Sequence, residues 1–205
     1  KEKFHADLRE SYRREREQEK ERYHNEIIGY HGSEEGLETL LGYQLFSIGN
    51  RADSAALVYQ VDYVLDGYVK KAGTNFVLSV GRLIGSQPEL KGEQRLRKED
   101  IYWEMPRCYQ WDITVNLPEG YRISPEGLER LNVKVENDCG AFIVQATTED
   151  GTLRIKAEKR INHKTEPVAN WEKLLEITDA ANSYEALSIV FQATINPPTS
   201  PTTGY

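Results

Sequence analysis

The chain has 205 residues, 29% of them charged, and a formal net charge of −7. This acidic balance argues against binding to nucleic acid or to an anionic membrane surface, because both are negatively charged and attract basic protein faces. No apolar run approaches the ~20 residues of a transmembrane helix, so no membrane span is predicted. Two cysteines, Cys108 and Cys139, are too few for a disulfide framework, which leaves two buried free thiols or a single bridge.

Residues 1–28 differ in composition from the rest of the chain. They carry eight basic and eight acidic residues, with no Gly or Pro, and opposite charges recur at helical spacing, as in Glu10 with Arg14. Apolar residues gather only near the two ends. We therefore predict one long charged helix over residues 1–30 that connects other parts of the protein. A coiled-coil partner site is the alternative, although no heptad repeat is sustained.

Most of the remaining chain has the two-residue period of β-strands. Residues 37–48 fit either a helix face or a strand. Residues 57–65 and 109–117 alternate apolar with polar side chains, which predicts strands with one buried face. Residues 131–161 repeat this pattern across two turns, as expected of a three-stranded antiparallel meander.

Turn residues and changes of period define the other boundaries. Asp66-Gly67 is a hairpin-type pair, and the polar passage 81–100 is too long for a turn, so it should run over the surface. Residues 168–183 change to helical period. Residues 196–205 are rich in Pro and Thr and should be disordered. The predicted fold is a mainly-β antiparallel sandwich, residues 31–195, with a long N-terminal helix and one helix near the C-terminus.

Several residues in the β region are candidates for a site. Arg95, Arg97 and Asp100 concentrate charge, and alternate residues of an extended chain project to the same side. These three residues either pin the long polar passage to the sheet or meet an anion or partner.

Aromatic residues offer a second set of candidates. Tyr59, Tyr63, Tyr109 and Trp111 occupy core-facing positions of the predicted strands. We therefore assign them to the core, with an aromatic sugar-binding face as the alternative.

A Cys/His pair is the remaining route to catalysis. His163 is the only histidine in the strand-rich part of the chain from residue 57 onward, and a thiol nucleophile requires a nearby base. Neither Cys108 nor Cys139 precedes a predicted helix, whose N-terminal dipole would activate the thiol. The four histidines lack metal-ligand spacing with Cys, Asp or Glu, and phosphate-loop and dinucleotide motifs are absent. No catalytic residue, metal or cofactor is predicted.

Six segments taken in order carry a family resemblance. They are residues 71–76 (KAGTNF), 81–87 (GRLIGSQ), 95–102 (RLRKEDIY), 117–121 (LPEGY), 137–142 (NDCGAF) and 171–175 (WEKLL). Their order and spacing resemble the C-terminal region of bacterial cell-envelope transglutaminase-like proteins. In those proteins a papain-like catalytic core lies between an N-terminal β domain and a C-terminal β-rich domain, both of unknown function.

The resemblance implies a non-catalytic accessory module of a larger protein, with a Cys-His-Asp core upstream of Lys1. That core of the same polypeptide is the implied partner, with an envelope protein or glycan as a further one. The implied location is the periplasm, the cell surface or the secreted fraction. A stand-alone glycan- or peptide-binding β-sandwich module is the alternative function.

Overall fold

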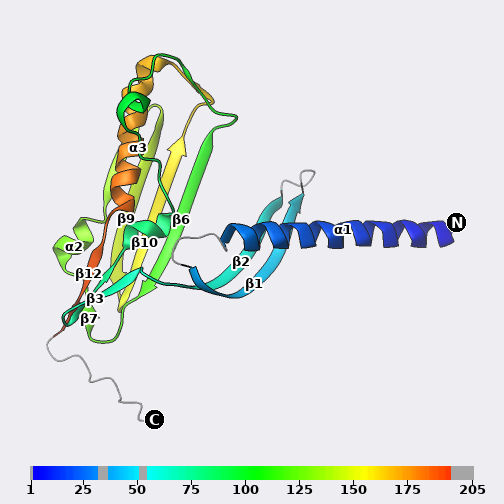
Figure 1. Cartoon of the computed structure of the whole chain (residues 1–205), viewed down its shortest axis with the longest axis horizontal. Helices are drawn as coiled ribbons and strands as arrows, with labels where there is room; N and C mark the ends of the chain where they lie inside the picture. The colour runs from blue at the N-terminus through cyan, green and yellow to red at the C-terminus, as the bar shows by residue number, and fades with distance from the viewer. Residues whose placement is uncertain (1, 32–36, 51–54, 195–205) are drawn as a thin grey trace, which may run out of the picture. The chain divides into compact units, whose positions relative to one another are not determined.

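The computed structural model describes residues 2–31, 37–50 and 55–194, and it forms two compact units, Lys1–Gly67 and Tyr68–Tyr205 (Figure 1). The fold is mainly β with antiparallel sheets, as the alternating sequence pattern predicts. None of the described helices is both long and apolar enough to cross a membrane. The predicted C-terminal tail lies outside the described residues, and the predicted domain boundaries at residues 30 and 195 stay predictions.

The first unit contains helix α1 (Glu2–His31) and an antiparallel ribbon of β1 (Leu37–Asn50) and β2 (Ala55–Leu65). Exposed ion pairs stabilise the charged middle of α1, where Glu10 lies 2.8 Å from Arg13 and 3.2 Å from Arg14. The ambiguous segment 37–48 is a strand, because its backbone pairs with β2 along its length.

The second unit contains three sheets, with strand orders β6-β10-β9-β8, β3-β4-β12-β7 and β11-β5. Its strands are β3 (Val69–Ala72), β4 (Asn75–Leu78), β5 (Ile101–Tyr102), β6 (Arg107–Asn116), β7 (Tyr121–Arg122), β8 (Val133–Asn137), β9 (Gly140–Glu149), β10 (Thr152–Ile161), β11 (Thr165–Glu166) and β12 (Ile189–Ala193). Its helices are α2 (Pro125–Glu129), α3 (Trp171–Glu185) and three 3-10 turns, η1 (Val80–Ile84), η2 (Gly92–Arg95) and η3 (Val168–Asn170). Strands β8, β9 and β10 form the predicted meander.

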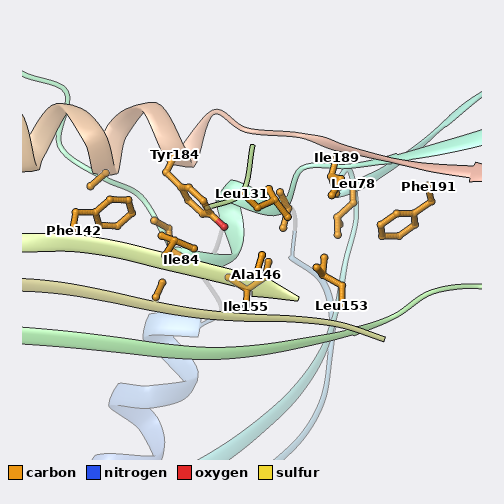
Figure 2. Packing of buried hydrophobic residues seen from close by; sticks show 14 of the residues in the cluster. Leu78, Ile84, Leu131, Phe142, Ala146, Leu153, Ile155, Tyr184, Ile189 and Phe191 are labelled. Atoms are coloured by element: carbon orange, nitrogen blue, oxygen red, sulfur yellow. The ribbon is translucent and has the colours of Figure 1, made fainter. Parts of the chain in front are cut away.

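The core of the second unit lies between one face of the β6-β10-β9-β8 sheet and a layer made of α3, η1, β4 and β12. Figure 2 shows Tyr184 extending from α3 into this layer near Phe142 and Ile84. Alternation along β10 places Leu153, Ile155 and Ala157 on the buried face. The sheet and α3 therefore share one apolar cluster.

Gly81 lets η1 approach the end of α3. A Cβ atom at this position would lie 1.9 Å from the carbonyl oxygen of Tyr184 and 2.5 Å from that of Glu185. The Gly81 N–H donates to the carbonyl of Leu187 at 3.0 Å. Only glycine permits this contact between two backbone segments.

Two connections between strands differ in how well they match the sequence pattern. Asp66-Gly67 is not a hairpin, because β2 pairs with β1 while β3 pairs with β4, so the pair joins two separate sheets. The polar passage after residue 80 does form a long excursion, with only η1 and η2 as regular structure. The β-sandwich stays a prediction.

Candidate functional site

Arg95, Arg97 and Asp100 of the polar passage each contact α3 or the segment that leads into it. The Arg95 guanidinium donates to both carboxylate oxygens of Asp179, at 2.8 and 2.7 Å. Arg97 lies 5.4 Å above the ring of Trp171, whose Nε1–H donates to the Arg95 carbonyl at 2.8 Å. These contacts connect η2 with α3 over a sequence separation of 84 residues.

Asp100 makes a comparable contact at the other end of the passage. Its carboxylate accepts the backbone N–H of Val168 at 2.8 Å, at the start of η3. The hydrogen bonds from Arg95 lower the pKa of Asp179 from its ordinary value. Contacts of this kind suit a role in holding the passage in place. Binding of an outside partner by these residues stays a prediction.

The two cysteines occupy different environments and are both free. Cys108 is exposed on β6, so the expectation that both thiols are buried is wrong for this residue. Cys139 is fully buried between β8 and β9. Burial, together with the neighbouring charge of Glu166, raises the pKa of the Cys139 thiol. A buried thiol with a raised pKa is a poor nucleophile.

Glu166 links Cys139 to the histidine singled out in the sequence. Its carboxylate is only 2% exposed and lies 2.5 Å from Nδ1 of His163, whose side chain is 55% exposed. Asn170 donates to the other carboxylate oxygen at 2.8 Å. The Cys139 thiol lies near the same carboxylate, whose charge contributes to the raised pKa of that thiol. Cys139 and His163 are therefore brought to one carboxylate rather than to each other.

The hydrogen bonds at Glu166 decide its charge state. Burial raises the pKa of Glu166, but hydrogen bonds from Asn170 and His163 outweigh burial and hold the pKa below its ordinary value of 4.5. The carboxylate is therefore ionised and anchors β11 to the start of α3. Its geometry is that of a buried polar hub.

Lys159 is a further titratable residue that the sequence did not single out. It lies on the inner face of β10, between Tyr109 of β6 and Phe142 of β9 in the sheet register. Its ammonium group donates to Oε1 of Gln87 at 2.9 Å. Burial lowers the pKa of Lys159, because the charged form loses water.

The outer face of the β6-β10-β9-β8 sheet, which points away from the core, is polar and carries a hollow. A shallow hollow of about 440 Å³ is lined by Gln110 and Asp112 of β6, Gln145 of β9, and Lys156 and Glu158 of β10, among others. The register places Asp112 opposite Lys156. Mixed charge and an open shape favour contact with a protein surface over enclosure of a small apolar ligand.

Aromatic side chains at the edge of this sheet are more exposed than predicted. Tyr109 is 46% exposed and stacks on Trp111, with ring centroids 6.0 Å apart and planes 22° apart. The core assignment is therefore wrong for Tyr109, and also for Tyr59 and Tyr63, which are 37% and 36% exposed. Trp111 is partly buried against the core cluster.

The first unit has an apolar ribbon face. The β1–β2 register places Leu40, Tyr43 and Leu45 opposite Tyr63, Val61 and Tyr59, respectively. The other face carries polar pairs such as Gln44 opposite Gln60. Three irregularities in β1 interrupt the register and leave extra residues. Two of these residues, Leu41 and Phe46, are 65% and 57% exposed.

Sequence patterns could find some of these features and not others. Alternation in residues 57–65 identifies one apolar face of β2, but only the register shows which β1 residues share that face. Glu166 and Lys159 carry no sequence signal beyond their residue type. Their burial depends on neighbours that come from distant segments.

A comparison with family models matches residues 81–191, more than half of the 205 residues, to the family described as Domain of Unknown Function with solved-structure structure (DUF3858). The match lies wholly within the second unit. Comparisons with curated proteins and with solved structures gave no significant match.

Proposed function

We propose that this chain, which belongs to the DUF3858 family, is a protein-interaction module without a catalytic role of its own. The apolar face of the β1–β2 ribbon carries this proposal. A two-stranded ribbon is only marginally stable in water by itself, because one layer cannot bury its apolar side chains. Exposed Leu41, Phe46 and Leu57 give this ribbon a surface suited to a protein partner.

The proposed partner is a transglutaminase-like catalytic core in the same polypeptide. This choice rests on the sequence resemblance, which implies such a core upstream of Lys1 in the cell envelope. In this proposal the module packs on or beside the core, and the charged helix α1 connects them. In that arrangement the module would hold the catalytic core, or the core's substrate, in a fixed position.

The test is binding between this chain and a separately expressed upstream core from the parent gene. Co-elution on gel filtration is the expected result. Leu57→Ser, on the apolar ribbon face, should weaken binding at least tenfold, because it removes apolar surface that the partner would cover and puts a hydroxyl there. Gln60→Ser, on the polar face of the same strand, is the matched control and should leave binding unchanged. Two species that elute independently would contradict the proposal.

A second candidate function is glycan or peptide binding by a stand-alone module. The stacked pair of Tyr109 and Trp111 favours it, because exposed aromatic faces stack on sugar rings and on extended peptides. Glycan arrays and peptide panels test it directly, with Tyr109→Ala as the variant that should abolish any signal. Absence of binding across both panels would remove this candidate.

A further inference from the structure

Within the described residues, strand β6 pairs with another strand along only one of its two backbone edges. It has ten residues and stands first in the order β6-β10-β9-β8, so β10 is its only strand partner among the described residues. Edge strands in soluble proteins are usually protected by a proline, a bulge or short length. Strand β6 contains no proline, and its register with β10 runs unbroken from Arg107 to Asn116. The opposite edge strand, β8, has only five residues.

The hydrogen-bonding pattern shows which groups face the open edge. The N–H of Leu117, directly after β6, donates to the carbonyl of Gly151 at 2.8 Å. In an antiparallel ladder, alternate residues bond to the same neighbour, so the odd-numbered residues of β6 bond to β10. The even-numbered residues therefore direct both their N–H and C=O groups outward: Cys108, Gln110, Asp112, Thr114 and Asn116.

We propose that this edge pairs with the β6 edge of a second copy of the chain, across a two-fold axis at Trp111, to make one continuous sheet. A two-fold axis brings two identical edges together antiparallel. For the inner faces of the two sheets to form one continuous face, odd-numbered residues must lie opposite odd-numbered residues, and even opposite even. The two longest such overlaps are centred on Trp111 and on Asp112. The choice between them follows from their side chains.

Centring on Asp112 places two carboxylates directly opposite each other, which is destabilising. Centring on Trp111 instead places Gln110 opposite Asp112 of the second copy, where an amide N–H can donate to a carboxylate. On the inner face, Trp111 meets Trp111 of the second copy, and Tyr109 meets Ile113. Aromatic and aromatic–aliphatic pairs of this kind stabilise sheets. The pairing forms about eight backbone hydrogen bonds.

The same pairing would cover the stacked aromatic pair that is half-exposed in the single chain. Tyr109 and Trp111 project from the inner face of the edge strand, where the core layer ends. A second sheet beside them removes apolar surface from water. The net charge of −7 on each copy opposes association, so the dimer should be stronger at 0.5 M salt than at 0.05 M.

Sedimentation equilibrium of the full chain tests the proposal. A concentration-dependent monomer–dimer equilibrium is expected for the unmodified chain. Thr114→Pro removes an N–H that faces the open edge and no N–H that bonds to β10, so the fold should survive and the dimer should weaken at least tenfold. Thr114→Val keeps that N–H and is the matched control. A monomer at all accessible concentrations, or a Thr114→Pro chain that dimerises like the control, would overturn the proposal.

Cysteine cross-linking tests the register independently. In a Cys108→Ser background, Trp111→Cys places two thiols across the two-fold axis at a non-hydrogen-bonded pair, within disulfide range. Mild oxidation should therefore give a covalent dimer for Trp111→Cys and none for Ile113→Cys, whose opposite residue is Tyr109. Cross-linking of Asp112→Cys in place of Trp111→Cys would overturn the proposed register, and dimers insensitive to all β6 variants would assign the interface elsewhere.

Discussion

The ring of Tyr184 packs edge-on against the ring of Phe142, with centroids 5.8 Å apart and planes 66° apart. This contact joins α3 to β9 in the centre of the second unit (Figure 2). The phenolic oxygen of Tyr184 is buried and has no hydrogen-bond partner within the described residues. An unpaired buried hydroxyl is a source of instability in an otherwise well-packed core.

Tyr184→Phe should therefore stabilise the protein by about 1 kcal/mol, because it removes a buried hydroxyl that forms no hydrogen bond. Urea denaturation at pH 7 measures this difference. Tyr121→Phe is the control: its hydroxyl donates to the Thr74 carbonyl at 3.1 Å, so its loss should be neutral or slightly destabilising. A Tyr184→Phe chain less stable than the unmodified chain would show that the hydroxyl has a stabilising partner.

The same residue predicts a dependence on alkaline pH. Burial raises the pKa of Tyr184 to about 12, from an ordinary value of 10.0. Between these values the unfolded chain loses the proton while the folded chain keeps it, so stability falls as pH rises from 10 to 12. The difference in unfolding free energy between Tyr184→Phe and the unmodified chain should therefore widen over this range.

Because of Glu166, we expect the free energy of unfolding to fall as pH decreases in the acidic range, whereas Tyr184 makes it fall as pH increases in the alkaline range. Its folded pKa lies below 4.5, so its contribution is present above pH 4.5 and is lost as pH falls through the folded value. Glu166→Gln should cost about 1–3 kcal/mol at pH 7, because it weakens the bonds to His163 and Asn170. The cost should shrink toward pH 3 in urea titrations. Glu172→Gln, exposed in the first turn of α3, is the matched control.

Lys159 should be replaceable with a gain in stability. Lys159→Met keeps the apolar stem and removes a partly buried charge, at the loss of one hydrogen bond to Gln87, for a net gain of about 1 kcal/mol. Because the folded pKa is lowered, the unfolded chain binds more protons just below pH 10.5, and stability rises with pH there. Lys156→Met, on the exposed outer face, should change neither the free energy of unfolding nor its dependence on pH.

We expect the ion pair of Arg95 with Asp179 to hold the polar passage, residues 81–100, against α3. Arg95→Ala removes both hydrogen bonds to Asp179, so residues 81–100 should open more often and be cleaved several-fold faster by an added protease. Lys98→Ala removes an exposed charge from the same passage and serves as control. To avoid the loss of a tryptic site in either variant, cleavage is best measured with a protease that does not recognise basic residues. Equal cleavage of the two variants would argue against pinning by Arg95.

Local sequence determined much of the strand content. The two-residue period of residues 109–117 and 131–161 corresponds to β6 and to the meander β8-β9-β10, because alternation on a half-buried strand is a local property. The helical period of residues 168–183 corresponds to η3 and α3 for the same reason. Segment 37–48 was ambiguous, because its apolar residues suit either period until a partner strand is present.

Only the tertiary structure decided which of these residues are covered. Cys108 and Cys139 look alike in sequence, yet the first is exposed on an edge strand and the second is fully buried near Glu166. Tyr109 follows the core pattern, but α3 packs over β8 and β9, and nothing in the described part of the second unit fully covers the end of β6. Arg95 meets Asp179 across 84 residues of sequence. Periodicity reports the direction of a side chain from its own strand, whereas burial, ion pairing and an open edge depend on segments that only folding brings together.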